Sequence, residues 1–229
     1  GVVTDLDAAT SRRAISSLFA ELRRRERLCA TAGRGSPRLV IVVDEFRVLA
    51  EEQPDLLAAL VRVAGVGRGL GVHLVLATQR PAGVVNGEIR ANTALRVALR
   101  VRERADSQDV IDAADAARLP TGTPGRALVR RGADELVEVQ IAQLPPDDRH
   151  RQVAAVQAAA QLLGSIVAPP PWLPELPERL TLADIPRLAG PAPTVGTPPP
   201  PGLRDGLLPY GLADLPARQR RTPLVWDSA

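Results

Sequence analysis

The chain has 229 residues, a formal net charge of +3 and 45% hydrophobic residues, a composition typical of a soluble globular protein with one or two domains. Aromatic residues make up only 2% of the chain, and arginine and acidic residues are interspersed rather than clustered, which argues against a base-stacking platform or a large DNA-binding patch. The single cysteine, Cys29, excludes an internal disulfide. We expect nothing within these residues to span a membrane by itself, because no apolar run reaches membrane-spanning length and the first residues have no signal-peptide pattern.

The first predicted element is an amphipathic helix over residues 10–30. Its apolar positions have helical spacing and are Ile15, Leu18, Phe19 and Leu22. Thr10 or Ser11 is the expected cap at the start of this helix. A segment rich in glycine and proline, residues 33–37, predicts a turn before the next element.

A run of five aliphatic residues, Leu39–Val43, ends in two adjacent carboxylates, Asp44 and Glu45. The unbroken run predicts a parallel strand that helices bury on both faces. Carboxylates at the end of such a strand lie where open α/β sheets bind ligands. In a nucleotide hydrolase one acid holds Mg²⁺ and the next orients the attacking water, so we assign Asp44 to the metal and Glu45 to the water. The alternative is an ordinary acidic turn after a buried strand.

Residues 54–64 predict a second helix, and four glycines follow it at alternate positions, Gly65, Gly67, Gly69 and Gly71. This spacing is not that of a phosphate-binding loop, and the glycines lead from a helix into a strand rather than the reverse. We interpret them as the end of the helix and a turn. Arg68 within this loop is a candidate arginine finger for a neighbouring subunit, although a solvated loop arginine is the commoner case and the favoured interpretation.

A second apolar run, residues 72–77, ends in Thr78, Gln79 and Arg80. With the strand before it, this segment resembles the FtsK/SpoIIIE family of ring-forming P-loop motors over about residues 10–145. The resemblance is carried by the segments VVDEF, GVHLVLATQRPAGVV, GEIRANTALRVALRV and ADSQDVID.

The resemblance implies a RecA-like α/β core, ATP and Mg²⁺ as cofactors, and a homo-oligomeric ring, a hexamer in this family. It implies that Thr78 and Gln79 sense the nucleotide beside the γ-phosphate, so that Gln79 joins Glu45 as a catalytic residue and Thr78 joins Asp44 in binding the nucleotide. A neutral amide at this place can bond to the γ-phosphate or the water and lose that bond after hydrolysis.

The chain departs from the family in having no G-x-x-x-x-G-K-[ST] sequence and no lysine. Without that loop no ring of backbone N–H groups surrounds the phosphates. We therefore expect residues 1–167 to be the C-terminal part of an ATPase module from a longer polypeptide. A module that has lost its phosphate-binding loop is the alternative.

Further elements complete the predicted core. We expect a strand over 95–101, a helix capped by Asp106 or Ser107 and running through Ala117, a hairpin of 125–131 with 135–141, and a helix over 147–163. The predicted fold class is therefore α/β, a partial RecA-like P-loop core with a mostly parallel sheet, flanking helices and a terminal hairpin.

Prolines dominate after Ala168, so residues 168–203 are predicted to be a semi-rigid linker with short docking segments such as 180–188. Residues 204–229 resemble the segment before the P-loop strand in tandem members of the family. A second module is therefore expected to begin there. Tandem modules are typical of type VII secretion ATPases, whereas DNA-pumping members usually carry one.

Three functions are compatible with the sequence. The leading one is an ATP-hydrolysing motor module that moves DNA or a secreted protein. The others are a regulatory module that binds nucleotide without turnover and a non-enzymatic proline-rich scaffold. The family resemblance implies a cytoplasmic location at the inner face of the cell membrane, with attachment only through regions outside this segment.

Overall fold

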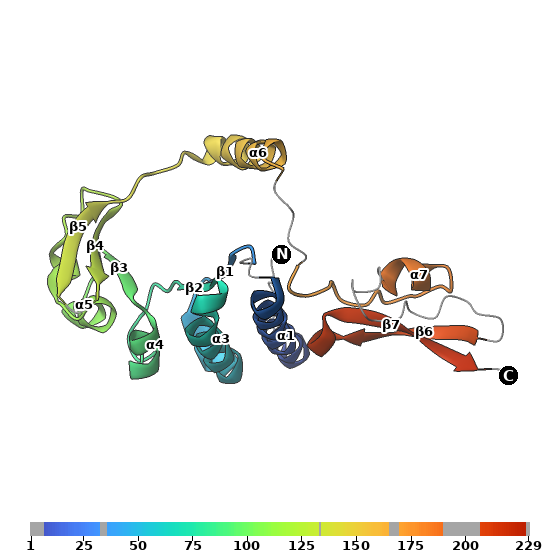
Figure 1. Ribbon diagram of the computed structural model, residues 1–229. Coiled ribbons are helices and arrows are strands. Elements are labelled where there is room, and N and C mark those ends of the chain that lie inside the picture. Colours follow the sequence, from blue (N-terminus) through green and yellow to red (C-terminus); the bar gives the residue numbers. More distant parts are fainter. Residues whose placement is uncertain (1–6, 33–35, 133, 165–169, 190–206, 228–229) are drawn as a thin grey trace. The chain divides into compact units, whose positions relative to one another are not determined.

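A computed structural model describes residues 7–32, 36–132, 134–164, 170–189 and 207–227 (Figure 1). The chain forms two compact units. One comprises residues 39–68 and 72–168, and the other comprises residues 1–38, 69–71 and 169–229. Among the described residues no helix is both long enough and apolar enough to span a membrane.

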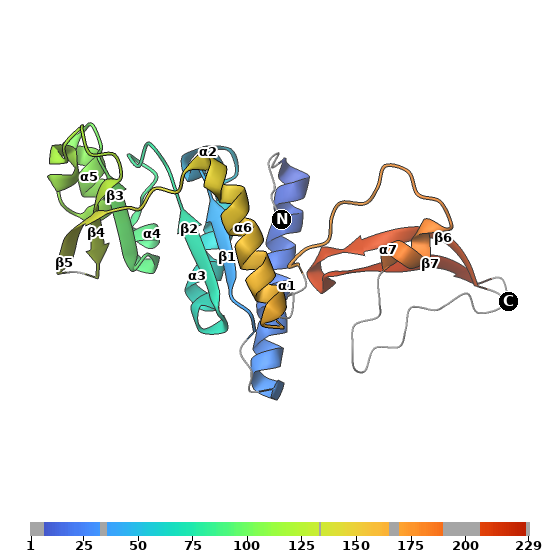
Figure 2. The same ribbon diagram turned by 90° about the horizontal axis from the view of Figure 1, so that it is seen from above.

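The first unit begins with two parallel strands, β1 (Leu39–Val43) and β2 (Val72–Leu76), which pair in register from Leu39 with Val72 to Val43 with Leu76. Between them the chain forms α2 (Phe46–Glu52), α3 (Pro54–Gly67) and the short 3₁₀ helix η1 (Arg68–Leu70). The predicted second helix is confirmed as α3, which has proline in its first turn and lies beside β2 (Figure 2). Its end at Gly67, followed by Gly71 with φ of 73°, agrees with the predicted helix end and turn.

The strand β1 differs from the prediction in its burial. Its residues alternate between half-buried and exposed, and the side chain of Val42 is 66% exposed. The side chains of α2 and α3 form the buried core beside these strands, and include Phe46, Leu60 and Val63. Within the described residues, one face of the β1–β2 pair is therefore open rather than covered by a helix.

A second sheet in the same unit has the strand order β3 (Leu95–Leu99), β4 (Arg126–Arg131), β5 (Glu135–Gln140), and both pairings are antiparallel. The predicted hairpin is confirmed as β4 and β5, although Ala133 in its turn lies outside the described residues. The helix α5 (Arg104–Ile111) and the 3₁₀ helix η2 (Asp115–Arg118) pack on one face of this sheet (Figure 1). A small core lies between them and contains Ala98, Ile111, Ala116, Leu119 and Leu128.

The predicted helix from Asp106 or Ser107 to Ala117 is wrong at both ends. α5 begins at Arg104 after Glu103, and it stops because Asp112 adopts a left-handed conformation with φ of 52°. The hydroxyl of Ser107 is used inside the fold instead of at a cap, where it accepts a hydrogen bond from the N–H of Ala116 at 3.1 Å.

The turn before β4 needs a glycine at position 125. Gly125 has φ of 82°, and a Cβ there would lie 2.8 Å from Nε2 of Gln140 and 3.0 Å from the carbonyl oxygen of Ile141. We expect Gly125→Ala to lower the free energy of unfolding by about 1–3 kcal/mol, because it adds both backbone strain and a steric clash. Urea unfolding measures this loss.

Gly122 provides the matched control in the same turn. A Cβ at Gly122 would meet no atom within 4 Å, so Gly122→Ala is expected to change stability much less. Equal losses in the two variants would contradict the assigned role of Gly125.

Two further helices belong to this unit. α4 (Gly87–Asn92) starts at Asn86, whose side chain accepts a hydrogen bond from the N–H of Ile89 at 2.9 Å. The predicted last helix is confirmed as α6 (Pro146–Leu162), which has no buried residue.

The second unit contains α1 (Ala8–Ala32), α7 (Asp184–Ala189), and the hairpin of β6 (Leu207–Leu215) and β7 (Arg220–Asp227), joined by η3 (Pro216–Arg218). The predicted first helix is thus confirmed as α1. Its cap is Asp7 rather than Thr10 or Ser11, because Asp7 accepts a hydrogen bond from the N–H of Thr10 at 2.7 Å, and this bond lowers the pKa of Asp7. Cys29 is exposed near the C-terminal end of α1.

The hairpin was not predicted, and α7 packs against both of its strands. The expected docking segment, 180–188, overlaps α7, while residues 190–203 of the predicted linker lie outside the described residues. The predicted domain boundaries, at 167–168 and 203–204, stay a prediction.

The fold is mixed α/β, as predicted, but its strands form three small sheets. Only the β1–β2 pairing is parallel among the pairings of the described strands. The expected mostly parallel sheet is therefore not found in this part of the chain. β3, β4 and β5 pair antiparallel, and a short turn joins β4 directly to β5, which imposes antiparallel pairing on those two strands.

Candidate functional site

The candidate site lies where β1 and β2 end at the same edge of the parallel pair. Beyond the last register pair, the N–H of Ala77 donates to the carbonyl of Val43 at 2.9 Å, and the N–H of Phe46 donates to the carbonyl of Ala77 at 3.0 Å. These two bonds extend the pairing past the strands. They fix the segment with Asp44 and Glu45 next to the segment with Thr78 and Gln79.

Glu45 is the centre of this arrangement. Its carboxylate Oε2 lies 3.4 Å from the hydroxyl of Thr78 and 3.4 Å from the backbone N–H of Gln79. Its backbone is left-handed, with φ of 48° and ψ of 48°, which is unfavourable for a residue with a Cβ. Such backbone strain is concentrated at functional sites, where the surrounding structure holds a side chain in a required position.

The other three predicted residues have different surroundings. Asp44 is exposed, and its carboxylate accepts a hydrogen bond from the N–H of Glu45 at 3.0 Å. Thr78 is half-buried, and its hydroxyl also accepts from the N–H of Arg80 at 3.1 Å. Gln79 is exposed, and its backbone N–H, rather than its side-chain amide, lies next to Glu45. The structure thus brings Glu45, Thr78 and Gln79 together, with Asp44 adjoining Glu45 along the chain.

The oxygen ligands at this site fit a magnesium ion that is bound mainly through the phosphate oxygens of a nucleotide. Mg²⁺ commonly uses one or two carboxylates together with waters and phosphate oxygens, and the exposed carboxylate of Asp44 matches one such ligand. The described residues contain no cluster of three or more His, Cys, Asp or Glu side chains that would hold a metal without phosphate.

Two features of the site had no signal in the residue pattern. The backbone bond from Phe46 to Ala77 involves no side chain, so no residue pattern marks it. The helix α2, which starts directly after Glu45, was also missed. Arg68, the candidate arginine finger, is exposed, and its role stays a prediction.

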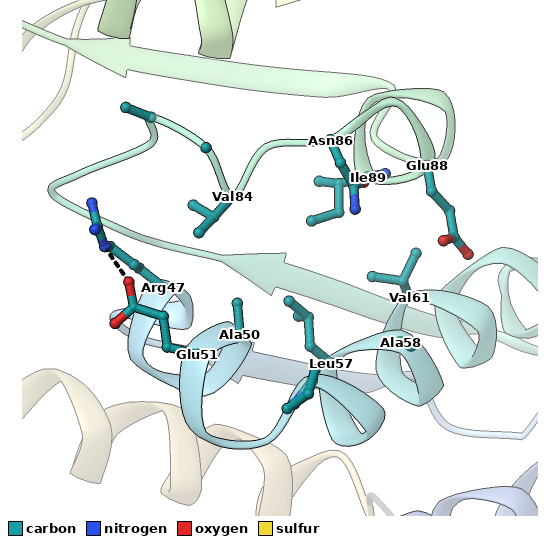
Figure 3. Close-up of a pocket in the computed structure, with 13 residues that line it drawn as sticks. Arg47, Ala50, Glu51, Leu57, Ala58, Val61, Val84, Asn86, Glu88 and Ile89 are labelled. Carbon is teal, nitrogen blue, oxygen red and sulfur yellow. Dashed lines mark hydrogen bonds and ion pairs between the residues drawn. The ribbon is translucent and has the colours of Figure 1, made fainter.

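A groove of about 410 Å³ lies next to the site, between α2 and α3 on one side and residues 82–89 on the other (Figure 3). Leu57, Val61 and Ile89 supply apolar surface to it. The ion pair of Arg47 with Glu51, 2.8 Å between Nε and Oε1, lies at its edge. The groove is chemically suited to an apolar side chain with polar groups around it. Because α2 follows Glu45 and residues 82–89 follow Gln79, both of its walls continue directly from the site.

No family model matches the chain. The chain is 39% identical over 156 residues to the type VII secretion system protein EssC of Staphylococcus aureus strain Mu50. This match covers 61% of the chain and 10% of EssC. The chain therefore spans about a tenth of the length of that curated relative.

Solved structures of secretion ATPases resemble the fold. The cytoplasmic domain of the type VII secretion ATPase EccC from Thermomonospora curvata has a TM-score of 0.68 and 26% identity, and the match covers 95% of this chain and 28% of that one. A structure of ATPases 2 and 3 of the same protein in complex with a signal sequence peptide has a TM-score of 0.59 at 23% identity, covering 97% of this chain and 40% of that one. Homologues of the chain are thus type VII secretion proteins, and its structural neighbours are their ATPase domains.

Proposed function

We propose that the chain is part of an ATP-hydrolysing module of a type VII secretion motor related to the FtsK/SpoIIIE ATPases. The observation that carries the proposal is the position of the Glu45 carboxylate against Thr78 and Gln79 at the ends of two parallel strands. The relatives support the same function, because the sequence homologue is a secretion protein and the structural neighbours are secretion ATPases.

Each residue of the site has a distinct task in this proposal. Asp44 supplies a carboxylate to the metal, and Glu45 accepts a hydrogen bond from the attacking water and orients it. The hydroxyl of Thr78 donates a hydrogen bond to the carboxylate of Glu45 and limits the rotation of that carboxylate. Gln79 carries an exposed amide that senses the γ-phosphate. Bound Mg²⁺ would neutralise charge on the phosphate oxygens.

The assembly and the cargo belong to the same proposal. We propose a homo-oligomeric ring, hexameric as in FtsK/SpoIIIE motors, that works in the cytoplasm at the inner face of the membrane through other parts of the protein. Secreted protein is the favoured cargo rather than DNA, because the homologue is a secretion protein and one structural neighbour was solved with a signal sequence peptide.

The cargo is tested by ATP turnover of the full-length protein in the presence of either duplex DNA or the signal sequence peptide of a secreted substrate. We expect the peptide, and not the DNA, to change the rate. A scrambled peptide of the same composition is the control. Stimulation by DNA alone would favour the DNA-translocating alternative, and ATP binding without any turnover would favour the regulatory one.

A further inference from the structure

The helix α1 carries a buried carboxylate, Glu21, whose side chain is 4% exposed. It accepts hydrogen bonds from Arg24 at 2.6 and 2.8 Å, from Arg25 at 2.7 Å and from the side-chain amide of Gln219 at 3.0 Å. Burial raises the pKa of Glu21, but the hydrogen bonds from Arg24, Gln219 and Arg25 outweigh it, so that the pKa is lowered. The group is therefore an ionised carboxylate in a buried place, which is stable only while its partners remain.

Gln219 connects this carboxylate to two other segments. It ends η3 in a left-handed conformation, with φ of 51°, and therefore lies at the turn between β6 and β7. Its amide nitrogen donates both to Glu21 and, at 2.8 Å, to the carbonyl of Pro171. One side chain thus joins α1, the hairpin and the proline-rich segment.

The segment 171–175, named here the strap, is held by two further arginines. Arg13 of α1 donates to the carbonyls of Leu173 at 2.6 Å and Pro174 at 2.8 Å, and pairs with Asp214 of β6 at 2.7 Å. Arg221 of β7 donates to the same Pro174 carbonyl and to that of Glu175 at 3.0 Å. Proline has no N–H, so a segment of this kind is bound through its carbonyls, and arginine supplies the donors.

A third contact leads from Glu21 to the turn 69–71. Arg25, which Glu21 orients, also donates to the carbonyl of Leu70 at 2.8 Å. Leu70 belongs to the turn 69–71, which lies in the same compact unit as α1 and continues directly into β2. β2 is the strand that ends before Thr78.

We propose that Glu21 is an electrostatic latch that holds the strap and the β6–β7 hairpin on α1 and, through Arg25, fixes the turn that begins β2. The latch holds residues 171–175 against α1 and the hairpin of the same unit, so this part of the proline-rich segment is not a free spacer. It is a property of the fold and does not depend on ATP turnover.

The test is amide hydrogen exchange of the full-length protein carrying Gln219→Glu, which places a second carboxylate against Glu21. We expect exchange of residues 207–227 and of the strap amides to become at least about tenfold faster, because like charges in a buried contact repel strongly. The strands β4 and β5 serve as the internal reference, since they lie in the other compact unit and their exchange should not change.

Two variants separate a latch from a general loss of structure. Arg218→Gln changes the net charge by the same −1, at an exposed neighbouring position, and it should leave exchange unchanged. Adding Glu21→Gln to Gln219→Glu removes the repulsion, so exchange should become slower than in Gln219→Glu alone. The proposal is overturned if Gln219→Glu leaves exchange unchanged, if Arg218→Gln has the same effect, or if the double variant shows no recovery.

Discussion

The Glu45→Gln variant of the full-length protein is expected to hydrolyse ATP about 10²–10⁴-fold more slowly than the unchanged protein, because the amide cannot accept the proton or orient the water as the carboxylate does. The replacement has nearly the same shape, so the contacts of Thr78 and Gln79 with position 45 remain sterically possible. Nucleotide binding should therefore persist. Steady-state turnover and equilibrium ATP binding, measured side by side, check both parts of this expectation.

The matched control is Glu52→Gln at the other end of α2. Glu52 is exposed, and the same change of a carboxylate to an amide there should leave turnover within about twofold. If turnover survives in Glu45→Gln, this unit does not hydrolyse ATP, and the regulatory module becomes the better interpretation. If ATP binding is lost as well, Glu45 has a structural rather than a catalytic role.

Replacing Ile111 with alanine is expected to lower the free energy of unfolding of the first unit by about 2–5 kcal/mol. Ile111 is completely buried at the C-terminal end of α5, in the core with Ala98 and Leu128. Two neighbours in this core, Ala98 and Ala116, are already small, so they cannot fill the space that the isoleucine leaves. Urea unfolding followed by hydrogen exchange of the β3, β4 and β5 amides measures the loss in this unit alone.

The control is Val97→Ala, which removes an aliphatic side chain from β3 that is 44% exposed. Its cost should be no more than about 1 kcal/mol, the range of strand propensity. A comparable loss at both positions would show that strand propensity, and not the packing of Ile111, determines the stability of this sheet.

Local pattern was sufficient to predict the two strands of the site. The apolar runs before Asp44 and Thr78 form β1 and β2, two strands of five residues each, and parallel pairing brings the residues that follow them to one edge. The helix α2 was missed because it has only seven residues, and Glu45, at its cap position, has neither a capping side chain nor an ordinary backbone conformation. The helix α4 was missed as well, in a segment that was interpreted as a loop, although Asn86, a strong helix cap, was a visible signal for it.

Contacts between distant segments could not be predicted in this way. Glu21 and Gln219 are 198 positions apart, and no periodicity in either segment indicates the partner. The burial of β1 was overestimated for a related reason. An unbroken aliphatic run shows that both faces of a strand can be buried, but which elements cover them depends on the rest of the fold.

The position of Cys29 on α1 gives the molecule a natural labelling site. Its thiol is exposed, it is the only one in the chain, and it lies eight residues beyond Glu21, or about 12 Å along the same helix. A maleimide dye or a nitroxide attached there would sit close to the Glu21 contacts without altering any of them. Spectroscopic distance measurements on this helix can thus begin from the native side chains of the chain.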